Sequence, residues 1–153
     1  MNIEQLKFPI GKYILNKSPD KEQLSWKYRP DGWTIKQLVH HCSDSHMNAL
    51  IRFKLALTED TPTIRPYFED RWAELSDSLN DDISDSLLIL RGLHNKWALL
   101  LKNLTSEELA LAFNHPEHGK SFKLAETIGN YAWHSNHHLA QIKQALNFKG
   151  EYH

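Results

Sequence analysis

The sequence has almost no cysteine, almost no net charge and no long apolar run. Its one cysteine, Cys42, cannot form an internal disulfide, which agrees with a reducing compartment. The formal net charge of -1 provides no broad basic field for nucleic acid or anionic lipid. The longest apolar runs, such as WALLLKNL, are far shorter than the roughly 20 residues of a membrane span, and MNIEQLKFPIGKY lacks a signal-peptide core. We therefore expect a cytoplasmic protein without a nucleic-acid or membrane partner.

The remaining composition is that of a folded domain. Of 153 residues, 41% are hydrophobic and 24% are charged, which is unlike a disordered chain. A chain of this length can bury about 70% of its unfolded surface. No internal repeat or low-complexity tract divides it, so residues 1–153 are expected to form a single domain.

Three long segments have apolar residues at helical spacing and predict an all-α protein. The first begins after Thr34, which forms a capping-box pattern with Gln37, and continues to about residue 57. The second covers about 84–104 with a leucine-rich stripe, and the third covers about 124–146. No strand-like alternation competes with these segments.

Two connecting segments carry predictions of their own. Residues 58–83 form a linker that is long for a compact domain, with one or two helical turns in FEDRWAELSD. Long ordered connections of this kind are often functional. Thr105 and Glu108 match another capping box and predict a short helix over 106–113, SEELALAF, before the turn-rich NHPEHGKS.

The third long segment contains a cluster of histidines in YAWHSNHHLAQI. Because each helical residue advances by about 100°, His134 and His138 fall on one shoulder of the apolar stripe and His137 falls on the solvent side. Two imidazoles at i and i+4 can reach the same metal ion. In a chain with ten histidines this spacing alone is a weak signal for metal.

A mononuclear site needs a third ligand, and HHCSDSH on the first long segment offers three histidines. His41 lies on the shoulder of that stripe, His40 points away from it, and His46 lies inside the apolar arc. Periodicity alone favours His46 as the inward residue. An inward histidine is also typical of a hydrogen-bonded core side chain, and the same holds for His94. The periodicity therefore leaves the third ligand open.

Several segments together carry a family resemblance. YRPDGWTIKQLVHHCSDSHMNALIRFKLALTEDTPTIRPY, LRGLHNKWALLLKNL, HPEHG and YAWHSNHHLAQI resemble, in order and spacing, the YfiT-like branch of the DinB superfamily over about residues 28–146. The resemblance implies an up-down-down-up four-helix bundle and a cytoplasmic homodimer. It also implies that one divalent metal per chain is held by His41, His134 and His138 at the mouth of the bundle.

The resemblance implies a metal-dependent hydrolase acting on a small molecule. A metal with three neutral imidazole ligands keeps an open position, where water can reach a pKa of about 7 and provide hydroxide. The alternative is an S-transferase that binds a low-molecular-weight thiol such as bacillithiol as thiolate, and a further alternative is a non-enzymatic metal or ligand-binding bundle. Zinc is the first expectation and nickel the second. Metal affinity should fall as the pH drops through about 6.5.

Further side chains are candidates around the metal. Asp44 and Ser45 lie one turn from His41 and could orient the imidazoles, although Asp44 also fits a solvated helix face. The candidates for lining a substrate cleft, of types that also occur in packing and at surfaces, are Arg52, Glu59, Trp72 and Trp133.

The N-terminus departs from the family pattern. In the family a long first helix follows FPIGKY, whereas here only ILNKSPDKE separates Tyr13 from Gln23. We therefore expect a first helix that is shortened or missing, with residues 1–30 as an extended arm with a short turn. Bundle surface left uncovered by this arm would favour a homodimer.

Overall fold

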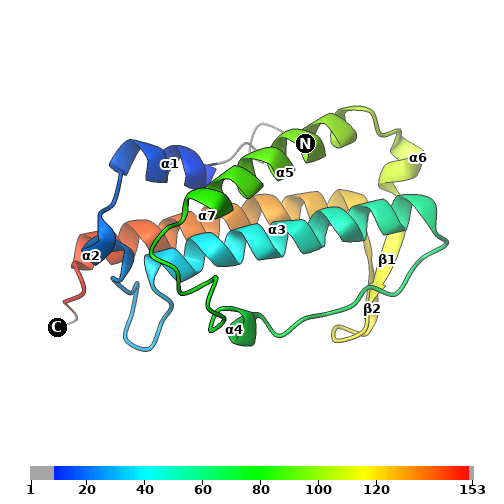
Figure 1. Cartoon of the computed structure of the whole chain (residues 1–153). Helices are drawn as coiled ribbons and strands as arrows, with labels where there is room; N and C mark the ends of the chain where they lie inside the picture. Colours follow the sequence, from blue (N-terminus) through cyan, green and yellow to red (C-terminus); the bar gives the residue numbers. More distant parts are fainter. Residues whose placement is uncertain (1–8, 152–153) are drawn as a thin grey trace.

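The computed structural model describes residues 9–151. Four helices form the bundle, in which α3 and α5 run in the same direction and α1 and α7 in the opposite one (Figure 1). This is the predicted up-down-down-up arrangement. The bundle helices are α1 (Pro9–Lys17), α3 (Ile35–Thr58), α5 (Ser84–Lys102) and α7 (Leu124–Phe148). The short elements are α2 (Lys21–Leu24), α4 (Glu69–Trp72), α6 (Ser106–Leu109), β1 (Ala112–His115) and β2 (Lys120–Lys123).

Helix α3 begins at the predicted capping box. The Thr34 backbone N–H donates to Gln37 Oε1 at 3.0 Å, and the Gln37 backbone N–H donates to Thr34 Oγ1 at 3.3 Å. Thr105 and Glu108 form the second predicted box at the start of α6. These reciprocal bonds satisfy backbone N–H groups that have no partner within the first turn of a helix.

The segment between α3 and α5 must return along the bundle because these two helices are parallel (Figure 1). Side chains from the first turn of α3 hold the second half of this connecting segment against the bundle. The Lys36 ammonium lies 2.7 Å from Asp81 Oδ1, and the Gln37 amide donates to the Ala73 carbonyl at 2.9 Å. The predicted long linker is therefore an ordered part of the fold, with α4 as its helical turn.

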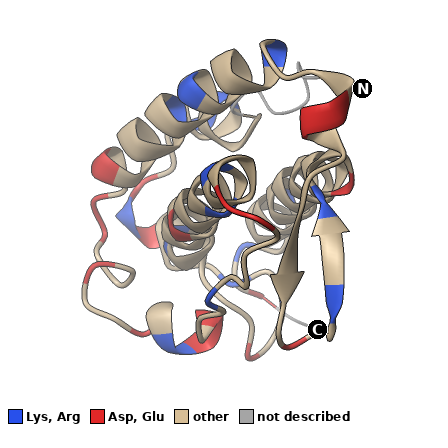
Figure 2. Ribbon diagram, turned by 90° about the vertical axis from the view of Figure 1, so that its right-hand side faces the viewer, with Lys and Arg blue, Asp and Glu red and all other residues tan. Residues whose placement is uncertain are grey.

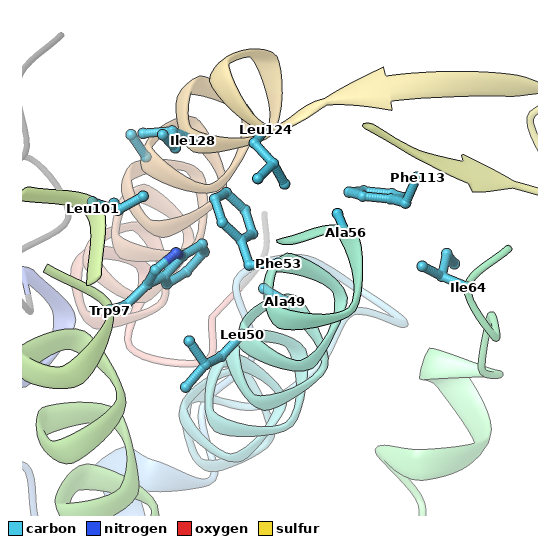
Figure 3. Close-up of a cluster of buried hydrophobic side chains, with 11 residues drawn as sticks. Ala49, Leu50, Phe53, Ala56, Ile64, Trp97, Leu101, Phe113, Leu124 and Ile128 are labelled. Atoms are coloured by element: carbon cyan, nitrogen blue, oxygen red, sulfur yellow. The ribbon is translucent and has the colours of Figure 1, made fainter. Parts of the chain in front are cut away.

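The apolar core consists of two clusters along the bundle. In the first, Phe53 of α3 and Trp97 of α5 are fully buried with ring centroids 5.0 Å apart, and side chains of α7, β1 and the linker surround them (Figure 3). The second cluster joins α1 to α3 and α7. Cys42 lies there, and burial raises the pKa of its thiol well above the ordinary value, so this cysteine is a core residue.

The predicted helix over 106–113 is wrong beyond Leu109, because the chain enters a β-hairpin at Ala112. Phe113 pairs with Phe122 across the two strands, with ring centroids 6.1 Å apart, and Phe113 packs into the first cluster. Each strand has only four residues. Such short strands show too little alternation for a period of two to be recognised.

The N-terminal segment also differs from the expected extended arm. Residues 9–17 form helix α1, and Ile10 and Ile14, one turn apart, are only 3% and 2% exposed in the second cluster. Residues 1–8 of the predicted arm lie outside the described residues. Among the described residues α1 has nine, against 24 in α3 and 25 in α7. The α1 segment therefore covers only part of the bundle's length.

The surface carries charges of both signs. Figure 2 shows Lys and Arg interspersed with Asp and Glu over the helices and connecting segments, without a field of one sign. Between residues 9 and 151, no helix combines the length and the apolar character that crossing a membrane requires.

Candidate metal centre

Three histidines from two helices converge on one point. His134 Nε2 lies 3.2 Å from His41 Nε2 and 3.0 Å from His138 Nε2, and the candidate ligand atoms of the three all lie within 4.8 Å of one another. Two ligands bound at about 2.0–2.1 Å in a tetrahedral geometry are about 3.3 Å apart. Two of the three nitrogen–nitrogen distances match this spacing, and ring rotations that bring the third pair within it would place all three atoms around a single divalent ion.

The same histidines are held in the neutral form that a metal requires. Burial, together with the other imidazoles, lowers the pKa of His41 to about 2 and that of His134 to about 3. Burial lowers the pKa of His138 to about 4, although its contact with Gln141 opposes this shift. Lone pairs of neutral rings that face one another repel, and a shared cation removes this repulsion. The donor set therefore suits a metal ion.

Helix phase explains why these histidines meet. His134 and His138 lie one turn apart on α7, and α3 packs against α7 so that His41 faces them. The Trp33 ring lies against His41 with a centroid distance of 4.7 Å and stacks on His138 at 6.4 Å. This indole forms a wall on one side of the cluster.

Gln141 is a contact of the cluster that the sequence interpretation missed. His138 Nδ1 and Gln141 Oε1 are 2.6 Å apart, so the ring N–H donates to the amide oxygen and the Nε2 lone pair faces the cluster. Helix phase could have indicated this contact, since Gln141 follows His138 by three residues on the same helix.

Replacing Gln141 by methionine is expected to lower the affinity for zinc by about 10- to 100-fold, because His138 loses the acceptor that fixes its tautomer. Competition with a chromophoric chelator measures the affinity. The matched control is Asn136→Met at an exposed position of α7, which should bind zinc like the original protein. Equal affinities for the two variants would contradict the role of Gln141.

His40 faces away from the three-histidine cluster, as predicted, but it is not on a solvent-exposed face. Its side chain is buried under α5 and the linker. His40 Nδ1 is 2.7 Å from Ser86 Oγ, and Nε2 is 2.9 Å from the Asn80 carbonyl oxygen. His40 therefore links three parts of the chain.

His40→Ala is expected to reduce the free energy of unfolding by about 1–3 kcal/mol, because it leaves buried hydrogen-bond partners unsatisfied. The zinc affinity of the folded variant should stay unchanged. Urea denaturation and chelator competition measure the two quantities. A His40→Ala protein that is as stable as the original but has lost zinc would reverse this assignment.

The inward position predicted for His46 is confirmed, because this residue is fully buried beside His94 of α5. The α3 histidine whose Nε2 approaches the α7 histidines is instead His41, at 3.2 Å from His134 Nε2. His137 is exposed and stacks on Trp133, with ring centroids 4.7 Å apart.

A cavity of about 330 Å³ adjoins the cluster at His134. Its lining includes three residues named from the sequence, Ser45, Arg52 and Trp133, together with Glu69 and Tyr131. Burial and the neighbouring Asp70 raise the pKa of Glu69, while the Arg52 charge opposes this shift. Glu69 comes from the linker, whose functional importance was expected although this residue was not named.

The other residues named from the sequence lie elsewhere. Glu59 is exposed at the end of α3, and Trp72 packs on Tyr67 with ring centroids 4.5 Å apart; neither lines the cavity beside His134. Asp44 is half-buried, and burial together with Asp77 raises its pKa to about 6, so it does not lie on a fully solvated face.

Comparison with known proteins identifies the family of this chain. The chain matches the family model of the DinB superfamily over residues 14–142. It is 54% identical over 141 residues to a Bacillus cereus protein named "Putative metal-dependent hydrolase", with 92% of this chain and 79% of that protein covered, and a Bacillus anthracis protein of the same name is 53% identical over the same length and coverage.

Among solved structures, YfiT from Bacillus subtilis is described as a probable metal-dependent hydrolase with an unusual four-helix bundle topology. It is 44% identical to this chain and superposes with a TM-score of 0.91, over 97% of this chain and 85% of YfiT. The family match, the sequence identities and the shared bundle together show that this chain belongs to the DinB superfamily.

Proposed function

We propose that the protein is a metal-dependent hydrolase of a small-molecule substrate, with one divalent ion held by His41, His134 and His138. The observation that carries the proposal is the convergence of the Nε2 atoms of two buried histidines and the half-buried His134 beside a cavity of about 330 Å³. The names of the relatives support the same activity. Zinc is the expected ion and nickel is the alternative, because both accept imidazole ligands.

The residues of the site have separable tasks in this proposal. The three imidazoles bind through Nε2 and stay neutral, since burial lowers their pKa values. When bound, a divalent ion acidifies water and polarises a carbonyl group. Arg52 supplies a positive charge in the cavity for an anionic part of the substrate, and the Trp133 ring provides an apolar wall.

Thiol transfer is the second candidate function, and the donor set supports it too. A site of three neutral imidazoles leaves the full charge of a divalent ion uncompensated by protein ligands. Such a site favours an anionic ligand, which a thiolate provides as well as a hydroxide. Arg52 would also attract a carboxylate of a low-molecular-weight thiol such as bacillithiol.

Metal analysis and turnover of protein purified without an affinity tag test the proposal. We expect about one ion per chain, hydrolysis of a panel of esters and amides, and loss of turnover on chelation that zinc restores. Turnover only with a thiol and an electrophile would select the transferase. Bound metal without either activity would leave a metal-binding bundle, and an absence of bound metal would refute the site.

We also infer that the protein forms a homodimer. Large apolar side chains are exposed on α1 and α5, including Leu15 at 64%, Leu88 at 63% and Leu99 at 66%. Removal of such leucines from water favours association. Light scattering should give twice the mass of the chain at micromolar concentration.

A further inference from the structure

A pair of buried histidines lies next to His134, one of the candidate metal ligands. His46 Nδ1 and His94 Nε2 are 2.6 Å apart, a hydrogen-bond distance, and the two side chains are 0% and 5% exposed. The His46 ring centroid is 5.6 Å from that of His134. The proposed function gives this pair no task.

The rings of His134 and His46 each have one buried nitrogen without a hydrogen-bond partner among the described residues: His134 Nδ1 and His46 Nε2. The indole Nε1 of Trp97, which packs on His46, is in the same state. Buried polar atoms are rarely left in this state, because each loses its bonds to water without compensation. The centroid distance of 5.6 Å between these rings is 0.8 Å longer than the 4.8 Å of the hydrogen-bonded His46–His94 pair, so the two rings are close to hydrogen-bonding range.

The proton positions required by a metal fit this arrangement. A neutral His134 that binds metal through Nε2 must carry its proton on Nδ1, and this N–H needs an acceptor. A neutral His46 that donates its Nδ1 proton to His94 Nε2 presents a lone pair at its own Nε2. Each ring then donates to the next, in the order His134, His46 and His94.

We propose that His46 is a positioning residue for the metal centre: it accepts the Nδ1 proton of His134 at Nε2, and its hydrogen bond to His94 fixes the tautomer that makes this possible. The inference rests on the proposed metal site. Gln141 has the matching role for His138, at 2.6 Å. Both α7 ligands are thus oriented from behind, one by an amide and the other by an imidazole pair.

A role in packing alone makes a different prediction. His46 also packs edge-on against Trp97 and Tyr131, with centroid distances of 6.1 and 5.5 Å. If packing were its only task, an apolar residue of similar size would preserve the metal site, because such replacements maintain core volume. If His46 is an acceptor, only a polar side chain that reaches the position of Nε2 would preserve it.

Three variants separate these roles through zinc affinity, measured by competition with a chromophoric chelator. His46→Leu should bind zinc about 10- to 100-fold more weakly, the usual effect of removing such a partner. His46→Gln, whose amide oxygen can accept the proton, should recover affinity to within a few-fold of the original protein. Trp97→Phe, which alters the same packing, should leave the affinity unchanged.

Nitrogen-15 NMR of the zinc-loaded original protein gives an independent readout. The Nδ1 proton of His134 should resonate as a slowly exchanging, hydrogen-bonded proton with a coupling to His46 Nε2. The signal should persist in His46→Gln and be lost in His46→Leu. The original protein is sufficient for this test if His46→Leu fails to fold, and absence of the coupling would overturn the inference.

The results also distinguish this inference from the proposed function. If the original protein binds no zinc, the metal site fails and this inference fails with it. If the original protein binds zinc and folded His46→Leu binds it within twofold, only the role of His46 is refuted. A folded His46→Gln that binds as weakly as His46→Leu would refute it as well.

Discussion

Replacing His134 by alanine is expected to lower zinc affinity by more than about 100-fold, a larger effect than the loss of an outer partner usually has. His134 Nε2 is the central atom of the cluster, within 3.2 Å of His41 Nε2 and 3.0 Å of His138 Nε2. The helix content should change little, since neither apolar core cluster includes this residue. Chelator competition and circular dichroism measure the two effects.

The neighbouring histidine provides the matched control. His137 is on the same helix but exposed against Trp133, so His137→Ala should bind zinc like the original protein. His138→Ala should behave like His134→Ala. If His137→Ala lost the metal and His138→Ala kept it, the assignment of the two helix faces would be wrong.

The metal-free protein is expected to lose several kcal/mol of stability between about pH 6.5 and pH 4. Burial lowers the pKa of both His94 and His138 to about 4, and that of His41 and His134 further still. The unfolded chain, with histidine pKa values near 6.5, therefore binds more protons than the native state over this interval. The stabilising contribution is present above pH 6.5 and is lost progressively as the pH falls towards the folded pKa values. A stability of about 5–15 kcal/mol would be largely removed.

Urea denaturation of the metal-free protein at a series of pH values tests this expectation. The midpoint should fall steeply below pH 6.5, and saturating zinc should move the decline to lower pH, because zinc binds the native state. A midpoint that stays constant from pH 7 to pH 5 would contradict it. The structure also revises the sequence-based expectation for metal release: since the folded imidazoles have pKa values far below 6.5, unfolding should precede proton competition at the intact site.

Helical periodicity and capping patterns predicted the long helices α3, α5 and α7 because these elements bury continuous apolar stripes. The same periodicity placed His134 and His138 together but could not select His41, since His46 is the more inward residue and has a different hydrogen-bonded partner. The motif resemblance made that selection. Glu69 could not be predicted to line the cavity, because an irregular linker has no helical or strand periodicity that shows which way its side chains face.

The hairpin was not predicted, and α1 was expected only as a shortened or missing first helix, for a different reason. Both are short, and their formation depends on contacts with distant parts of the chain, such as Phe113 in the first core cluster and Ile14 in the second. Local sequence preferences are weak in segments of this length, so tertiary packing decides their conformation.

The pairing of His41 with His134 joins two positions that are 93 residues apart in the chain. A metal ion bound there would be a reversible cross-link between distant segments of a protein whose single cysteine provides no internal disulfide. In the chain-entropy description, a permanent link closing a loop of about 100 residues is worth about 4–5 kcal/mol. The availability of metal in the surroundings would then control how strongly helices α3 and α7 are held together.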